Sequence, residues 1–484
     1  MAVDSNKVKL NLLDRTVAWI NPREGMRRLQ ARRSYEAAQF GRRNKSMKGA
    51  TSNGPNVEIG VALQTLRNRS RSFVRNNGWA KRALGVIVTN TVGEGIRPAP
   101  TSGTRNQIKK IKQVWKHWAE STECDWDGNN TFYGLQQLIM SEISEGGDCL
   151  IIRRRVKPTR FNPIPIKIQV LEGDQLDHQK NFINAEGYCR LGVQFNKEGL
   201  KIGYWVWSSN PNDMAVNWTG IQSELISIDD VLQPFEVLRA GQVRGVPSGV
   251  SAFMKMSDFS DYEDAQLMRQ KVAAAFAAFV KNHEFKSGED SDLTEHIEPG
   301  IIQYLQQEEE ITFSNPPAAD GYGEYSKKIL QGIAAGYEIT YEMLTMDYSN
   351  VNFTSGRMAK IDVSGRFRKL QYNMMVPQVC VPIWRWFMDS LLMVGLTGVF
   401  VDCDASDWTA PPTQMLDPVK ETNAIIAQIS AGLTTWSEVA RERGRDPDEL
   451  LEEVKQERQK MIDAGIIFTS VVMAPVEAKV NENV

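Results

Sequence analysis

Three aspartates near the C-terminal end of the chain have the spacing of a metal site. Asp402, Asp404 and Asp407 place three carboxylates close together in the sequence, and carboxylate oxygens bind the divalent cations of nucleases. Such a site also needs oxygens from a second segment, and no second cluster stands out in the sequence as the partner of this one. A metal-dependent DNA-processing enzyme is therefore one interpretation. A solvated loop after a strand at 398–401 is the other, because short motifs often match by chance.

Other patterns that indicate catalysis or cofactor binding are absent from the sequence. There is no phosphate loop of the form GxxxxGK[ST], no GxGxxG motif and no GxSxG motif. The four histidines are too dispersed for a zinc motif: His117, His178, His283 and His296. Nucleotide hydrolysis by a P-loop and serine hydrolysis therefore lack support. Our leading prediction is a protein that is not an enzyme and that has no cofactor and no metal ion, with the metal-dependent enzyme above as the alternative.

The cysteines and the longest apolar stretch indicate the compartment. Five scattered cysteines without a CxxC pair predict a reduced, cytosolic protein with buried thiols: Cys124, Cys149, Cys189, Cys380 and Cys403. The polar N-terminus lacks the apolar core of a signal peptide. Residues 374–396 are apolar but contain Pro377, Pro382, Arg385 and Asp389, which predicts a buried, kinked helix and no membrane span.

Length and composition are those of a folded protein with several domains. The 484 residues suffice for about three domains, and 42% hydrophobic and 24% charged residues exclude a disordered, collagen-like or disulfide-framework chain. The chain has 57 Lys and Arg against 59 Asp and Glu, a net charge of −2. A uniformly basic nucleic-acid binder is excluded, although local patches are not.

Charge is distributed unevenly along the chain. Residues 1–82 hold 18 Lys and Arg against five Asp and Glu, so residues 1–59 are expected to be a basic arm, partly disordered. A nucleic-acid arm and a solvated or subunit-contacting tail remain equal alternatives. Residues 283–320 hold ten Asp and Glu against one lysine, and residues from 415 onward hold 13 against eight basic residues.

Periodicity and caps predict the elements that would position any site. Apolar spacing of three and four indicates helices from about Val61, over 79–90 and over 105–121, whereas alternation indicates a β-rich unit over 149–238. Further helices are expected over 252–281 and 325–346, the second followed by a polar break at 347–354. A strand pair at 301–305 and 311–313 fits inside the acidic insertion.

The last third of the chain is expected to be helical. Ser355 is a suitable N-cap for a long helix that its prolines bend twice. Three short capped helices then form a small α-domain: they follow Asp417-Pro418, Thr435 with Glu438, and Asp446-Pro447.

A series of segments, in a fixed order, points to a known family. They are LRNRSRSFVRNNGWAKRA (66–83), NTVGEGI (90–96), GQVRGVP (241–247), DYED (261–264), IAAG (333–336), YEML (341–344), DYSNVNFTSGR (347–357), WTAP (408–411) and DP (417–418). Together they resemble the lambda-type phage portal proteins, the head–tail connectors, over residues 60–465.

The resemblance implies an α+β multidomain portal fold. Its parts would be a mixed α/β wing, two helical stem segments with an inserted small β-containing clip, a long kinked helix and a C-terminal helical crown. The corresponding ranges are 1–59 for the arm, 60–250 for the first part of the wing, 251–282 and 321–346 for the stem helices, 283–320 for the clip, 347–354 for the tunnel loop, 355–414 for the kinked helix and return to the wing, 415–470 for the crown and 471–484 for a tail.

The resemblance also implies a function and its site residues. Twelve subunits would form a ring at one capsid vertex, the channel for packaging and ejection of double-stranded DNA. The tunnel loop would face the DNA, with Tyr348 bracing it and Asn350, Asn352 and Phe353 nearest the duplex: Asp347, Tyr348, Ser349, Asn350, Val351, Asn352, Phe353 and Thr354. The clip would dock terminase and the adaptor: Glu284, Lys286, Glu289, Asp290, Asp292, Glu308, Glu309 and Glu310.

The partners and location follow from the same resemblance. They would be the other subunits, the major capsid and scaffolding proteins, the terminase large subunit and the head-completion proteins, with no membrane. The protein would lie in the virion at the portal vertex, and in the host cytoplasm during assembly. Besides the metal-dependent enzyme, a basic-armed DNA-binding protein remains the alternative.

Overall fold

The computed structural model of the chain describes residues 12–27, 52–160, 162–213, 222–274, 278–282, 309–313, 321–395, 406–411, 417–445 and 447–465. The chain divides into two units, Met1–Glu58 and Ile59–Val484. In the first unit, helix α1 (Leu12–Ile20) lies in the predicted basic arm. The elements described below belong to the second unit, apart from the first turn of helix α3.

Helices α3 (Pro55–Asn76) and α4 (Gly78–Thr91) follow one another with a break at Asn77. The Asn77 side chain accepts hydrogen bonds from the backbone N–H groups of Trp79 at 3.0 Å and Ala80 at 3.2 Å, and thereby caps α4. The predicted interruption of the helix is confirmed. Helix α3 begins six residues before the expected Val61, because Pro55 suits the first helical position.

A cluster of aromatic rings joins three further helices. Helix α5 (Arg105–Ala119), helix α6 (Phe132–Gly146) and helix α11 (Val381–Val394) surround Trp115, whose ring lies 5.2 Å from Phe132 and 4.9 Å from Trp384. Trp118 and Phe387 are also buried here. The predicted amphipathic helix is confirmed, and the tryptophans on it are core residues.

Two antiparallel sheets confirm the predicted β-rich unit. One has the order β3-β2-β9 and the other the order β4-β5-β6-β7-β8, and buried side chains of both, among them Ile152 and Tyr204, share one core. The 3₁₀ turns η3 (Thr122–Cys124) and η4 (Gly173–Gln175) flank the smaller sheet. The strands are β2 (Cys149–Arg155), β3 (Ile166–Glu172), β4 (Phe182–Asn184), β5 (Gly187–Arg190), β6 (Val193–Asn196), β7 (Lys201–Trp207), β8 (Ser223–Ser227) and β9 (Val231–Leu232).

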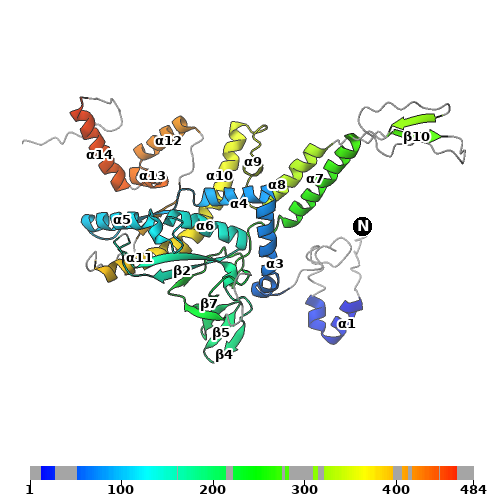
Figure 1. Cartoon of the computed structure of the whole chain (residues 1–484), viewed down its shortest axis with the longest axis horizontal. Helices are drawn as coiled ribbons and strands as arrows, with labels where there is room; N and C mark the ends of the chain where they lie inside the picture. The colour runs from blue at the N-terminus through cyan, green and yellow to red at the C-terminus, as the bar shows by residue number, and fades with distance from the viewer. Residues whose placement is uncertain are drawn as a thin grey trace, which may run out of the picture. The chain divides into compact units, whose positions relative to one another are not determined.

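Helices α7 (Phe253–Ala274) and α8 (Tyr322–Gly336) pack side by side (Figure 1). The predicted helix over 252–281 is wrong at its C-terminal end, because strand β10 occupies Ala278–Asn282. This strand pairs antiparallel with β11 (Glu309–Phe313), from Ala278 opposite Phe313 to Asn282 opposite Glu309. Cross-strand pairing here outweighs the helix propensity of the alanines.

The expected strand pair in the acidic insertion is therefore half right. Residues 311–313 lie in β11 as predicted, but the partner of this strand precedes the insertion. Residues 301–305, which we expected to supply the partner, lie outside the described residues.

A short helix and a long one complete the middle of the chain. Helix α9 (Tyr341–Thr345) is followed by helix α10 (Phe353–Leu370), the π-helix η5 (Gln371–Cys380) and α11. Pro377 lies inside the π-helix, and a proline lies in the first turn of α11. Wider π turns at a proline are a known cause of bending. The structure thus contains the proline irregularity on which the prediction rests, and the bend itself stays a prediction.

The C-terminal helices begin at the predicted positions. Helix α12 (Pro418–Ser430) is capped by Asp417, helix α13 (Trp436–Glu442) by Thr435, and helix α14 (Pro447–Asp463) begins at its proline. Strands β1 (Arg97–Pro100) and β12 (Ser406–Thr409) pair antiparallel. None of the helices that the structure describes is long and apolar enough to cross a membrane.

Candidate functional site

The loop between α9 and α10 carries the residues predicted to face DNA. Met346 ends α9 in the left-handed conformation, with φ of 59°. Six residues then run from Asp347 to Asn352, and α10 starts at Phe353. The side chains of Tyr348, Ser349 and Asn350 at the tip are exposed. The loop thus presents mainly uncharged polar groups to its surroundings.

Asp347 holds the first half of this loop in one conformation. Its carboxylate accepts hydrogen bonds from the Ser349 hydroxyl at 2.6 Å, from the Ser349 backbone N–H at 3.1 Å and from the Tyr341 hydroxyl at 3.3 Å. The bonds from Ser349 hold the pKa of Asp347 below its usual value. The one charged residue of the loop is therefore engaged within it.

Asn352 fixes the second half of the loop. Its side chain accepts a hydrogen bond from the Ser355 backbone N–H at 2.8 Å, and its own N–H donates to the Ser355 hydroxyl at 3.1 Å. This is a reciprocal cap of α10. The prediction that Ser355 is the N-cap is wrong by three residues, because Asn352 supplies the capping acceptor.

The helices on either side of the loop are anchored to the rest of the protein. The Arg82 guanidinium of α4 donates to the Met343 carbonyl of α9 at 3.0 Å. On α10, Arg366 binds Glu236 through two bonds of 2.5 and 2.6 Å and binds Glu338 at 2.5 Å. Both ends of the loop are consequently attached to ordered structure.

The predicted site residues divide into three groups. Of the loop residues, Phe353 and Thr354 belong to α10. Tyr348 is 60% exposed, and the bracing contacts that the structure shows are those of Asp347. Glu309 and Glu310 lie in β11. The other predicted clip residues lie outside the described part of the chain: Glu284, Lys286, Glu289, Asp290, Asp292 and Glu308.

The aspartates of the possible metal site are only partly described. Asp402 and Asp404 lie outside the described residues, and Asp407 lies in β12, with Arg441 at 3.9 Å. Among the residues that the structure describes, no three His, Cys, Asp or Glu side chains are grouped to hold a metal ion.

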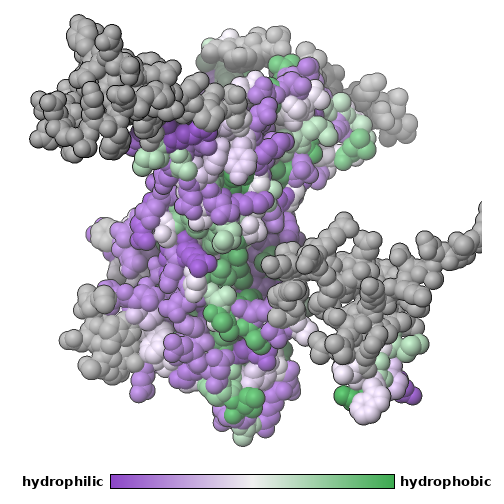
Figure 2. Space-filling view, turned by 90° about the vertical axis from the view of Figure 1, so that its right-hand side faces the viewer, coloured by the Kyte–Doolittle hydropathy of each residue, from purple (hydrophilic) through white to green (hydrophobic). Residues whose placement is uncertain are grey.

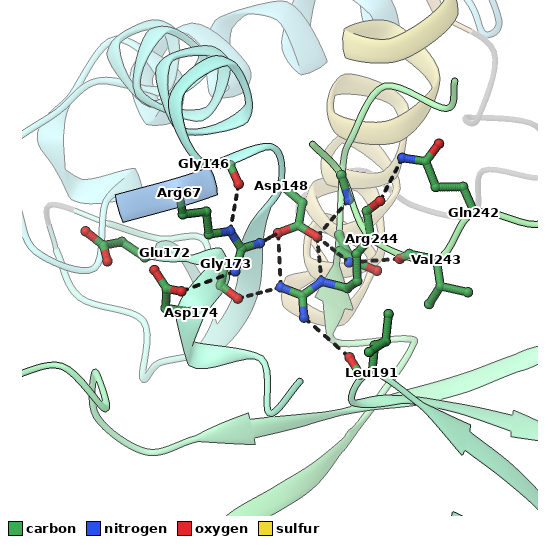
Figure 3. A network of polar contacts seen from close by, with 12 residues as sticks. Arg67, Gly146, Asp148, Glu172, Gly173, Asp174, Leu191, Gln242, Val243 and Arg244 are labelled. Atoms are coloured by element: carbon green, nitrogen blue, oxygen red, sulfur yellow. Dashed lines mark hydrogen bonds and ion pairs between the residues drawn. The ribbon is translucent and has the colours of Figure 1, made fainter. Parts of the chain in front are cut away.

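A buried carboxylate joins three distant segments of the second unit (Figure 3). Asp148, in the turn between α6 and β2, lies between the guanidinium groups of Arg67 from α3 and Arg244 from the loop after β9. The side chains of all three are 1% exposed or less. Arg244 Nε donates to Asp148 Oδ2 at 2.7 Å, and the amide of Gln233 donates to the same oxygen at 2.9 Å.

The remaining N–H groups of the two arginines donate to nearby backbone carbonyl oxygens and to a carboxylate. Arg67 donates to the Gly146 carbonyl at 2.7 Å and to Asp174 at 3.2 Å, and Arg244 donates to the Gly173 carbonyl at 2.7 Å. Two buried cations are thus matched by two buried carboxylates and by backbone oxygens. Such a network is stabilising only when its donors and acceptors are satisfied.

Ion pairing in this network opposes the effect of burial on the pKa of its carboxyl groups. Burial alone would raise the pKa of Asp148, but Arg244 and Arg67 outweigh it and hold that pKa below its usual value. Asp174 behaves in the same way beside Arg67 and Arg71. Both acids are therefore charged at neutral pH in the folded protein.

The pKa of Glu142 on α6 is shifted in the opposite direction, upward. Burial, and then the neighbouring Glu172, raise the pKa of Glu142 to about 7, although Arg71 lowers it. The folded protein therefore holds this proton up to about neutral pH, whereas the unfolded chain releases it near pH 4.5.

This network was not predictable as a unit from the sequence. Arg67 and Arg244 lie in two of the segments that carry the family resemblance, but Arg67 was counted with the basic N-terminal region. A signal does exist in the glycines: Gly147 has φ of 91°, and a side chain on it would lie 2.7 Å from the backbone of Gly245. Gly147, next to Asp148, and Gly245, next to Arg244, thus mark the point where the two backbone segments approach closely.

Comparisons with known proteins are consistent with one another. A family model described as "Phage portal protein, lambda family" matches residues 40–371. A "Probable portal protein" of Halomonas phage phiHAP-1 is 23% identical over 460 residues, covering 90% of this chain and 88% of that protein. "Portal protein B" of Escherichia phage lambda is 21% identical over 472 residues, covering 86% of this chain and 88% of that protein.

A solved structure shares the fold. It is described as "Neck of native GTA particle computed with C12 symmetry", is 13% identical, covers 84% of this chain and 99% of that chain, and has a TM-score of 0.50.

We predict that Asp148→Asn destabilises the folded protein by about 3–5 kcal/mol, because the substitution leaves two buried guanidinium groups without their shared carboxylate. Urea unfolding followed by circular dichroism measures this loss. The matched control is Glu453→Gln, which removes an exposed carboxylate beside Arg445 and should cost at most about 1 kcal/mol. Equal losses in the two variants would contradict the central role of Asp148.

We also predict a pH-dependent effect of Glu142→Gln. The folded pKa lies above the usual value of 4.5, so this group's contribution to stability falls as the pH rises from about 4.5 to 7. Glutamine resembles the protonated acid, so the variant should be more stable than the natural protein by about 1–3 kcal/mol at pH 8 and equal to it at pH 4. Thermal unfolding measures the difference, with exposed Glu94→Gln as control. A gain at both pH values would contradict the assignment.

Proposed function

Because this chain belongs to the lambda family of phage portal proteins, whose model matches more than half of it, we propose that twelve copies form a ring at one vertex of a phage capsid. Double-stranded DNA enters the head through this ring during packaging and leaves through it during ejection. The shared fold with a neck protein described with twelvefold symmetry supports the choice of twelve subunits. The protein lies in the virion after it has assembled in the host cytoplasm.

The observation that carries this proposal is the loop from Asp347 to Asn352. A conduit must contact DNA without holding it, and each phosphate neutralised by Lys or Arg adds affinity. The exposed tip offers tyrosine, serine and asparagine side chains, while the carboxylate of Asp347 is engaged by Ser349 and Tyr341. A polar loop with an uncharged tip and two anchored ends suits a sliding contact.

Exposed apolar side chains support assembly into a closed ring. On α7, Met254, Leu267 and Met268 are at least half exposed, and on α10 Met358 and Ile361 are likewise exposed. Figure 2 shows hydrophobic patches along the middle of one face of the molecule, between hydrophilic borders. Contacts between neighbouring subunits in a cyclic ring would bury such surfaces.

The elements then take the roles that the family resemblance implies. The two sheets with α3 to α6 form the wing, α7 and α8 form the stem, and α12 to α14 form the crown. The hairpin of β10 and β11, with the acidic residues between the two strands, forms the clip that docks terminase and the head-completion proteins. The wing contacts the major capsid and scaffolding proteins.

A structural role without catalysis fits these observations better than an enzyme. Asp407 lies beside Arg441, a cation that competes with a metal ion for the carboxylate. The nuclease alternative therefore gains no support from the one aspartate of the three that the structure describes.

We predict that added positive charge at the loop tip slows DNA packaging. Ser349→Lys with Asn350→Lys would place two lysines per subunit against the phosphates, so the duplex would be held and not only guided. Packaging into capsids, measured as DNA protected from nuclease, should fall at least about tenfold. The matched control, Ser349→Ala with Asn350→Ala, should package at close to the natural rate.

Native mass spectrometry of both variants accompanies this experiment. The mass should be that of twelve chains in each case, because the loop tip is not expected to hold subunits together. Natural packaging by an assembled lysine variant would sink the proposed channel position of the loop.

A further inference from the structure

Helix α5 carries a row of positive charges on its solvent-facing side. Arg105, Lys109, Lys112 and Lys116 recur at steps of four, three and four residues, so they share one face of the helix. The buried face of the same helix is formed by Ile111, Trp115, Trp118 and Ala119. The sequence from Arg105 to Ala119 contains no Asp or Glu.

These side chains are accessible in the folded protein. Lys109, Lys110 and Lys116 are exposed, and no ion pair of theirs occurs in the described part of the chain. Arg105 is 90% exposed and lies 3.8 Å from Glu452 of α14. We call this surface the basic face of α5. It consists of the row Arg105, Lys109, Lys112 and Lys116 together with the exposed Lys110, which lies beside the row and not within it.

The basic face continues into a hollow between β1, α5 and the turn that joins α13 to α14. The hollow has a volume of about 160 Å³, and Arg97, Lys112, Lys116 and Arg445 all line it. Two carboxylates also line it, Glu120 and Glu449. Glu120 lies 3.5 Å from Arg97, and Glu453 pairs with Arg445. The four cations therefore exceed the three acids by one, and the hollow keeps a small positive balance.

We propose that the basic face of α5 and this hollow bind the phosphate backbone of double-stranded DNA that lies outside the channel. The row from Arg105 to Lys116 extends about 16 Å along the helix axis. A duplex carries one phosphate charge per about 1.7 Å of its axis, so several phosphates lie within reach of such a row. Contacts of this kind require cation density and no particular base sequence.

The basic face differs in chemistry from the channel loop. The tip of the loop from Asp347 to Asn352 is uncharged and suits sliding, whereas a row of lysines holds a duplex in place. The inference goes beyond the proposed function and rests on it in one respect, that DNA is the cargo. An acidic protein segment is the competing partner for a basic surface.

The test uses the full-length assembled protein and a relaxed, covalently closed circular DNA. A closed circle cannot thread through a closed ring, so its binding reports the outer surface alone. The variant Lys109→Gln, Lys110→Gln and Lys116→Gln removes three exposed cations. Its matched control is Arg69→Gln, Arg190→Gln and Lys197→Gln, three exposed basic residues on α3 and the five-stranded sheet and its turn.

The α5 variant should bind the circle about tenfold more weakly than the natural protein, and the control should bind within about twofold. The slope of log K against log salt should become shallower by about 2.7, since each phosphate contact contributes about 0.9. Channel function is measured separately by packaging, so loss of one activity is distinguishable from loss of the other.

Three results would overturn the proposal. Equal binding of the circle by the α5 variant and the control would remove the special role of α5. Unchanged DNA binding with lost binding of polyglutamate would assign the surface to an acidic protein. A changed ring mass in the α5 variant would place these lysines between subunits.

Discussion

The position of the loop depends on one buried carboxylate. Asp148 binds the guanidinium groups of Arg67 and Arg244, and so fixes helix α3 and the loop after β9 against the start of β2. Helix α3 in turn packs on α7 through Phe73 and Phe253, whose rings lie 5.3 Å apart, and continues through Asn77 into α4. Arg82 of α4 holds α9, and α9 carries the loop. A charge that cannot be left unpaired in the interior therefore positions a surface loop several elements away.

The protein uses charged and polar groups in three different arrangements. In the Asp148 network of the interior, the guanidinium groups are paired with carboxylates, because each unpaired charge would cost several kcal/mol. At the loop, the single carboxylate, Asp347, is hydrogen-bonded by Ser349 and Tyr341, and the exposed tip is neutral. The basic face of α5 is a third arrangement, with lysines left in solvent. The Asp148 network, the neutral loop tip and the basic face of α5 thus lie in different parts of the protein. A chain with a net charge near zero can have such different surfaces because its charges are segregated.

Local chemistry made most of the fold predictable from the sequence. The break at Asn77, the caps at Asp417 and Thr435 and the alternation around Tyr204 each reflect contacts within a few residues or along one strand. Prediction failed where distant segments decide the structure. Residues 278–282 look helical alone but pair with 309–313. Arg67 looks like one more cation of the basic segment 1–82 until Asp148 and Arg244 are brought to it. The channel loop was predictable as a polar break, but its bracing by Asp347 and Tyr341 was not.

The central claim is that the loop from Asp347 to Asn352 lines the bore of a ring of twelve subunits. The most direct measurement is a cryo-electron microscopy map of the assembled protein with a duplex in its channel. The account predicts twelve copies of Tyr348, Ser349 and Asn350 around the axis, as the protein groups nearest to the DNA. A map that places these side chains between subunits, away from the axis, would contradict it.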